Sequence, residues 1–213
     1  MRSAVYRDRK QANQLPVDDP ARQRIIALAR RHFFAYGFRG VTMDDLAKEL
    51  GMSKKTLYTH FSGKAALIGA ALLDKSREIE KDLDRITSDC ASDFLAALYQ
   101  LLSCMQLHLE EFRPPFLRDV QRESPEMFKL VEERREDLIH RYFGKLLDEG
   151  RKSGMIREDI QAGLLLEIFL GAIQAIVNPK KLAELGLTPK EGFSAIITVI
   201  LEGVITETGR SNL

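Results

Sequence analysis

The sequence predicts an all-α protein with a small N-terminal domain of short helices and a larger C-terminal domain of longer ones. Apolar residues recur at helical spacing along most of the chain, and no segment alternates as a strand does. The 213 residues, 45% hydrophobic and 30% charged, supply enough apolar material for a folded core. The sequence contains no run of 18 uncharged apolar residues, so we expect no membrane-spanning helix.

The net charge of +1 conceals an uneven distribution of charge. Residues 1–66 contain 13 lysines and arginines against 6 acidic residues, a charge of +7. Residues 67–213 contain 19 against 25, a charge of −6. A basic N-terminal third indicates a module that binds a polyanion, although charge alone leaves open a solvated basic surface or a membrane-binding one.

Capping residues and glycines mark the helix boundaries of the N-terminal part. Asp19 before Pro20 is typical of a helix start, and Gly37 of a helix end in the left-handed conformation. Thr42 with Asp45 three residues later resembles a capping box. These patterns predict helices over residues 20–36, 42–50, 53–61 and 64–86.

The flanking segments are assigned in the same way. Residues 1–18 are polar and basic without a sustained period, so we expect a flexible arm. Further helices are predicted over residues 91–112, 116–122, 125–153, 160–177 and 189–208. With only Cys90 and Cys104 and no signal peptide, the chain is expected to lie in the cytoplasm with reduced thiols.

Residues 42–61, TMDDLAKELGMSKKTLYTHF, have the pattern of a helix-turn-helix. Ala47 allows the second helix to cross closely, Gly51 permits the turn, and Leu57 fills the angle between the helices. Away from the side of Leu57 the second helix carries basic, hydroxyl and aromatic residues without an acid: Lys54, Lys55, Tyr58 and Thr59. This side is the candidate surface for the DNA major groove.

Two residues at helix starts are candidate phosphate contacts. Lys64 lies in the first helical turn, where the macrodipole disfavours a cation, and its ammonium can join the terminal N–H groups on one phosphate. Thr42 can offer its hydroxyl and its backbone N–H. The alternatives are a simple cap for Thr42 and core packing for Tyr58.

The segment from Arg22 to Leu67 resembles the DNA-binding domain of the TetR family of bacterial transcriptional regulators. The run Thr56-Leu57-Tyr58-x-His60-Phe61-x-x-Lys64 is the most specific part of the resemblance. It implies about nine helices, with a DNA-binding domain over residues 19–80 and an effector-binding and dimerisation domain over residues 81–213. Carried over by position, it implies DNA contacts from Thr42, Ser53, Lys54, Lys55, Thr56, Tyr58, His60 and Lys64.

The last two long helices, over residues 160–177 and 189–208, are apolar over most of their circumference. Such helices are buried on more than one side, so we expect a two-fold dimer through a four-helix bundle and a palindromic operator. Aromatic, methionine and histidine side chains of the C-terminal domain either form its core or line an effector pocket: Met105, His108, Phe112, Phe116, Phe128, His140, Phe143 and Phe169.

The predicted function is a ligand-responsive repressor that a small-molecule effector releases from double-stranded DNA. The sequence contains no common catalytic motif, and we predict no cofactor. His140 with Glu136 and Cys104 with His108 are pairs at helical spacing, but one histidine per helix is a poor ligand set, so no metal site is predicted. The alternatives are an all-α enzyme or a protein-interaction module with a helix-turn-helix-like element.

Overall fold

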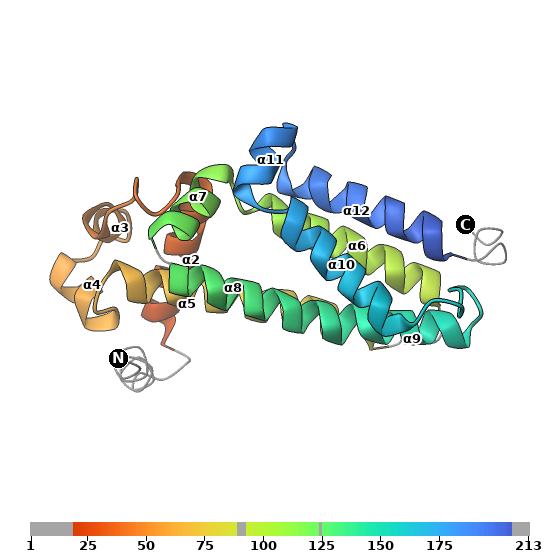
Figure 1. Cartoon of the computed structure of the whole chain (residues 1–213). Helices are drawn as coiled ribbons and strands as arrows, with labels where there is room; N and C mark the ends of the chain where they lie inside the picture. The colour runs from red at the N-terminus through yellow and green to blue at the C-terminus, as the bar shows by residue number, and fades with distance from the viewer. Residues whose placement is uncertain (1–18, 89–92, 124, 206–213) are drawn as a thin grey trace. The chain divides into compact units, whose positions relative to one another are not determined.

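The computed structural model describes residues 19–88, 93–123 and 125–205, and within these residues it contains ten continuous helices and no strand (Figure 1). One isolated antiparallel bridge joins Ile156 to Ile205. The prediction of an all-α fold is confirmed. The predicted arm over residues 1–18, Cys90 and the predicted helix end at 206–208 lie outside the described residues.

The contacts divide the chain into two units. The first contains the residues up to Lys75 together with Arg113–Ser124, and the second contains Ser76–Phe112 and the residues from Pro125 onward. No sequence pattern indicated that residues 113–124 group with the N-terminal helices. The assignment of DNA binding to residues 19–80 and of effector binding to 81–213 stays a prediction.

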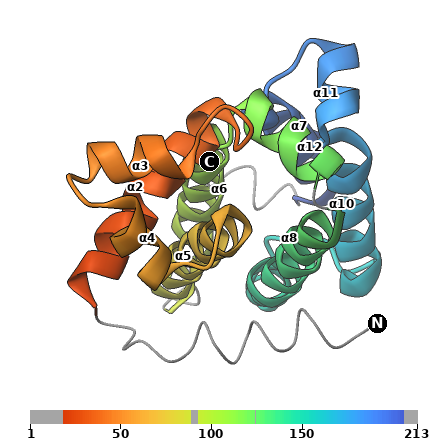
Figure 2. The ribbon, with the colours of Figure 1, turned by 90° about the vertical axis from the view of Figure 1, so that its left-hand side faces the viewer.

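The first unit contains α2 (Pro20–Tyr36), α3 (Met43–Glu49), α4 (Lys54–His60), the start of α5 (Lys64–Thr87) and α7 (Pro114–Glu123), as Figure 2 shows. Asp19 caps α2, and the predicted capping box of α3 is present. The core of this unit consists of aliphatic and aromatic side chains: Ile25, Ile26, Ala29, Phe33, Leu46, Leu57, Leu67 and Ile68.

The link after α2 depends on Gly37 and on Asp119 of α7. Gly37 has φ 76° and ψ 162°, so the prediction of a left-handed helical residue was wrong in ψ, although φ is positive. Two residues further on, the N–H of Arg39 donates to Oδ2 of Asp119, at 2.9 Å. A Cβ at Gly37 would lie 2.5 Å from that same oxygen, so the contact between loop and α7 requires glycine.

The second unit contains the rest of α5 and the long helices of the C-terminal part. These are α6 (Phe94–Glu110), α8 (Pro125–Leu138), η1 (Ile139–Phe143), α9 (Gly144–Lys152), α10 (Ala162–Ile176), α11 (Pro179–Leu185) and α12 (Pro189–Val204). Within this unit α12 packs against both α6 and α10. The core between them includes Leu98, Leu101, Phe143, Phe169, Ile173 and Phe193.

Two local features of the second unit differ from the prediction. The segment between the last two long helices contains the short helix α11, which Asn178 caps through its side chain and Pro179 begins. The predicted helix over residues 125–153 is continuous but contains one π-helical turn, η1. This turn directs Tyr142 inward, where its hydroxyl donates to Oδ1 of Asp84 at 2.7 Å.

None of the helices among the described residues combines the length and the apolar composition that a membrane-spanning helix needs. The helices α10 and α11, which are bent by 74° relative to each other, reach the length and apolar composition of a membrane span only when they are counted together.

Candidate DNA-binding surface

The turn between α3 and α4 fixes the direction of α4. Gly51 adopts φ 66° in this turn, and the N–H of Met52 donates to the carbonyl of Ala47 at 3.0 Å. The side chain of Ser53 then accepts from the N–H of Thr56 at 3.0 Å and caps α4. Leu57 is fully buried, as the spacing predicted, so one side of this short helix is anchored in the core.

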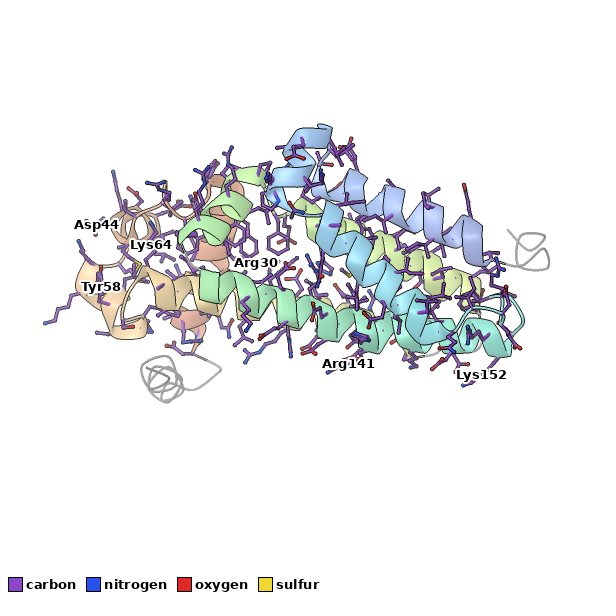
Figure 3. The ribbon with its side chains drawn as sticks, viewed as in Figure 1. Arg30, Asp44, Tyr58, Lys64, Arg141 and Lys152 are labelled. Atoms are coloured by element: carbon purple, nitrogen blue, oxygen red, sulfur yellow. The ribbon has the colours of Figure 1, made fainter. Side chains whose placement is uncertain are left out.

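The opposite side of α4 faces outward. Lys54, Lys55 and Thr59 are exposed, and 43% of Tyr58 is accessible to solvent. The alternative that Tyr58 packs in the core is therefore wrong. Figure 3 shows Tyr58 at the same end of the first unit as Asp44 and Lys64.

Two of the residues expected to contact DNA, Lys54 and His60, each lie beside an acidic residue that the sequence did not pair with them. Nζ of Lys54 lies 2.8 Å from Oδ1 of Asp44, and the hydrogen bond to Asp44 raises the pKa of Lys54. Nδ1 of His60 lies 3.2 Å from Oδ2 of Asp19. A DNA phosphate that binds His60 would therefore have to contact Nε2, the other ring nitrogen. Asp44 belongs to the first turn of α3, where acids are common, so its position alone did not indicate the pairing.

Thr42 is engaged in a capping box that uses both groups expected to meet a phosphate. Its N–H and its hydroxyl both donate to Oδ2 of Asp45, at 3.1 and 2.6 Å, and its oxygen accepts from the N–H of Asp45. The hydroxyl and amide of Thr42 lower the pKa of Asp45, so this carboxyl stays ionised near neutral pH. A phosphate at Thr42 would compete with that carboxylate.

Lys64 begins α5, and its ammonium lies 5.9 Å from the ring centroid of Phe38. The side chain of Lys64 is half-buried, so its aliphatic part is held against the protein. Its ammonium lies near the N-terminus of α5, which is the positive end of the helix dipole. No acidic residue occurs in the first turn of α5. The start of this helix can therefore hold an anion through N–H groups and an ammonium.

The candidate effector residues do not form one cluster. The rings of Phe143 and Phe169 lie 4.5 Å apart and line a narrow apolar cavity of about 30 Å³ in the second unit. Phe116 instead packs on Phe34 in the first unit, at 4.8 Å between centroids, and His140 is exposed on η1. Met105 and Phe112 are half-buried and His108 is buried, whereas the side chain of Phe128 lies outside the described ones.

The helix-turn-helix and its exposed cationic side define a DNA-binding protein, and the comparisons agree. The sequence model described as "Bacterial regulatory proteins, tetR family" matches residues 25–71. The transcriptional repressor DhaR of Mycobacterium sp. strain GP1 is 22% identical over 89% of this chain and 94% of its own length. The uncharacterised regulator YvaF of Bacillus subtilis strain 168 is 25% identical over 87% and 96%.

Solved structures show the same fold over nearly their whole length. The ketosteroid transcriptional regulator KstR2 of Mycobacterium tuberculosis has a TM-score of 0.57 and 20% identity, over 90% of this chain and 98% of that one. SmeT, described as the repressor of a multidrug efflux pump of Stenotrophomonas maltophilia, has a TM-score of 0.61 and 17% identity over 92% and 93%. The chain is a DNA-binding transcriptional regulator. Its residues 25–71 match the TetR-family model, and the chain as a whole is similar to transcriptional regulators in sequence and fold.

Proposed function

We propose that this regulator is a repressor that binds a palindromic operator as a homodimer and leaves it when a small-molecule effector binds. The observation that carries the proposal is the exposed side of α4, with Lys55 and Tyr58 outward and Leu57 fixed in the core. Because the chromosome lies in the bacterial cytoplasm, a regulator of this kind acts there.

The proposed DNA contacts divide by chemistry. Residues at the start of α4 meet base edges, and residues at helix starts or with exposed hydroxyls meet phosphates. Lys54 exchanges its ion pair with Asp44 for a contact with a phosphate or a base when DNA binds. The loss of the ion pair offsets part of the free energy gained from the new contact. The full set is Thr42, Ser53, Lys54, Lys55, Thr56, Tyr58, His60 and Lys64.

The proposed dimer uses the outward faces of α10 and α12. On α10, Leu165, Phe169 and Ile173 are buried in the unit, whereas Leu164 and Ile168 are 53% and 49% exposed. On α12, Val199 is 72% exposed. Nothing lies within 4 Å of a Cβ at Gly163 or Gly171, so a second chain can approach α10 closely. Exposed apolar faces on neighbouring helices support a four-helix interface between two copies.

The proposed effector is a small apolar or aromatic molecule. The cavity beside Phe143 and Phe169 is enclosed by α6, α9, α10 and α12, and its 30 Å³ has room for about one water. An organic effector there would have to move these helices apart. SmeT, which is similar in fold, has also been solved in complex with triclosan, in a structure 15% identical in sequence to this chain. The effector would shift DNA affinity only by its differential affinity for two states of the dimer.

DNA binding is testable with the full chain and a duplex selected from a random-sequence library. We expect a palindromic site whose affinity falls steeply with salt, measured by fluorescence anisotropy. Lys64→Gln should weaken binding about ten-fold or more and lower the salt slope by about one. Tyr58→Phe removes one hydroxyl from a charged acceptor and should weaken binding about ten-fold.

Lys129→Gln is the matched control, because Lys129 of α8 in the second unit is 77% exposed in its side chain. It should leave both the affinity and the salt slope unchanged. Selection of no palindromic duplex, or equal losses for Lys64→Gln and Lys129→Gln, would contradict the proposal and favour the alternatives of an enzyme or an interaction module.

A further inference from the structure

A cluster of ligand-type side chains lies between α5 and α6 in the second unit. It borders an open cavity of about 460 Å³, whose lining includes Asp82, Arg85, Tyr99, Cys104 and His108. The donor atoms of Asp82, Cys104 and His108 all lie within 4.8 Å of one another. A carboxylate, a thiol and an imidazole at this spacing are the donor types that bind divalent transition metals.

The distances fit a metal site after a small movement. Nε2 of His108 lies 3.2 Å from Oδ2 of Asp82. Ligand bonds of about 2.0–2.3 Å in a tetrahedron place two donor atoms roughly 3.3–3.8 Å apart. The carboxylate and the imidazole are therefore already near the required separation. A rotamer adjustment of about an ångström would complete the set with the Cys104 thiol, which is reduced and half-buried.

The helices hold these groups in register. Cys104 and His108 are four residues apart on α6, so their side chains share one face of that helix. Asp82 lies on the facing helix, and Glu78 stands four residues before it on α5. Donors on helices are positioned more rigidly than donors on a loop.

A second carboxylate lies behind the histidine. Nδ1 of His108 is 3.8 Å from Oε1 of Glu78, and the histidine side chain is only 8% exposed. Metal-binding histidines commonly donate their second ring N–H to a carboxylate, which fixes the tautomer and raises the basicity of the ligand nitrogen. Glu78 can close to hydrogen-bonding distance from this position. The arrangement places Nε2 on the side of Asp82 and Nδ1 on the side of Glu78.

The charges also match a divalent ion. A thiolate and one carboxylate supply two negative charges, and the imidazole binds while neutral. Arg85 also lines the cavity, and its guanidinium lies 3.6 Å from Oδ1 of Asp82 and is 74% exposed. It can turn into solvent when Oδ2 binds an ion. Sulfur and imidazole donors favour zinc-class ions over Mg²⁺ or Ca²⁺, which prefer oxygen.

We propose that Asp82, Cys104 and His108 form a three-ligand site for a divalent transition-metal ion such as Zn²⁺, with the fourth coordination position open to the cavity. Three protein ligands plus one exchangeable position are typical of sites that also bind a small molecule or water. The proposal does not depend on DNA binding. The sequence alone did not predict this site, because Asp82 lies 22 residues before Cys104, outside any spacing motif.

Cobalt tests the ligand set directly in the full chain, without DNA. We expect one Co²⁺ per chain, displaced by Zn²⁺, with a thiolate-to-cobalt charge-transfer band in the near-ultraviolet and tetrahedral d–d bands in the visible. Cys104→Ser should remove the charge-transfer band and lower Co²⁺ affinity at least ten-fold. Glu78→Gln should keep the band and weaken affinity about ten- to hundred-fold, as loss of an outer carboxylate does.

Cys90→Ser is the matched control, because Cys90 is the only other thiol of the chain and should leave the spectrum unchanged. Circular dichroism of each variant checks that the helices persist. Absence of Co²⁺ and Zn²⁺ binding by the unmodified chain would overturn the proposal. Binding without the thiolate band would also overturn it and would favour the carboxylate-rich grouping of Glu78, His108 and Glu111.

Discussion

The two units present their candidate binding surfaces on very different helices. In the first unit the surface rests on α4, a helix of 7 residues with one buried side chain, Leu57. In the second unit the proposed dimer faces belong to α10 and α12, of 15 and 16 residues. A helix as short as α4 has little stability of its own, so caps and the turn must fix it. The longer helices are fixed by apolar contacts along their length.

This difference separates two kinds of recognition. The surface on α4 is polar and exposed, and its residues are positioned by a core that they do not enter. The faces of α10 and α12 are apolar on both sides, so the same helix supplies the core of its unit and the proposed interface. A surface change on α10 should therefore break the dimer and through it weaken DNA binding, whereas one on α4 should weaken DNA binding and leave the dimer intact.

The largest expected effect is on the dimer. Ile168→Glu places a charge in the centre of the apolar face of α10, where desolvation of an unpaired carboxylate would oppose association. We expect a monomer at micromolar concentration by sedimentation velocity. Affinity for the palindromic duplex should fall at least about a hundred-fold, because the two half-sites are no longer bound by one particle.

Leu73→Glu is the matched control for that substitution, since Leu73 of α5 is 47% exposed in the first unit. It should remain a dimer. A dimeric Ile168→Glu variant would show that the apolar face of α10 is not the interface.

A smaller effect, on the free energy of unfolding, is expected when one closely packed glycine in each unit is replaced by alanine. A Cβ at Gly37 would meet Asp119, and a Cβ at Gly150 would lie 2.6 Å from Cε2 of Phe94. Each alanine variant should lose about 1–3 kcal/mol of unfolding free energy, measured by urea denaturation, through backbone strain at Gly37 and overpacking at Gly150. Gly69→Ala, a helical position with nothing within 4 Å of the Cβ, should be neutral or stabilising.

The sequence patterns used for prediction were local ones. The predictions that the structure confirms are accordingly those that depend on residues close together in the sequence. Asp19, Thr42 and Ser53 each cap the helix that follows, because a cap depends on residues within one turn. The prediction that Leu57 is buried succeeded for the same reason, since the helix-turn-helix lies within 20 residues. No helix is predicted between residues 177 and 189, although Asn178 and Pro179 form an ordinary start, because the 7 residues of α11 are too few to show a helical period.

Long-range partners could not be predicted from those signals. Asp119 meets the loop at Gly37 across about 80 residues of sequence, and Phe116 packs on Phe34 in the first unit. The contact between Oδ2 of Asp19 and Nδ1 of His60 likewise joins the start of α2 to the end of α4. Without an indication of which helices pack together, no pattern in one segment identifies such a partner.

The smallest expected effect compares two capping boxes, one in each unit. Thr42 with Asp45 begins α3, and Thr188 with Glu191 begins α12 by the same hydrogen bonds. Thr42→Ala and Thr188→Ala should each cost about 1 kcal/mol of unfolding free energy in urea. Only Thr42→Ala should also weaken duplex binding, because only the first box belongs to the DNA surface. Equal DNA affinities of the two variants would remove Thr42 from that surface.

The pH dependence of the free energy of unfolding tests the same two capping boxes. Hydrogen bonds from the threonines lower the pKa of both Asp45 and Glu191. A folded-state pKa below the unfolded one means that each box stabilises the protein at neutral pH and loses this contribution as the pH falls below about 4. Each threonine variant should therefore be less sensitive than the unmodified chain to acid over that window, in urea denaturation at fixed ionic strength. An unchanged acid dependence in both variants would show that the threonine hydroxyls do not hold the carboxylates in their ionised form.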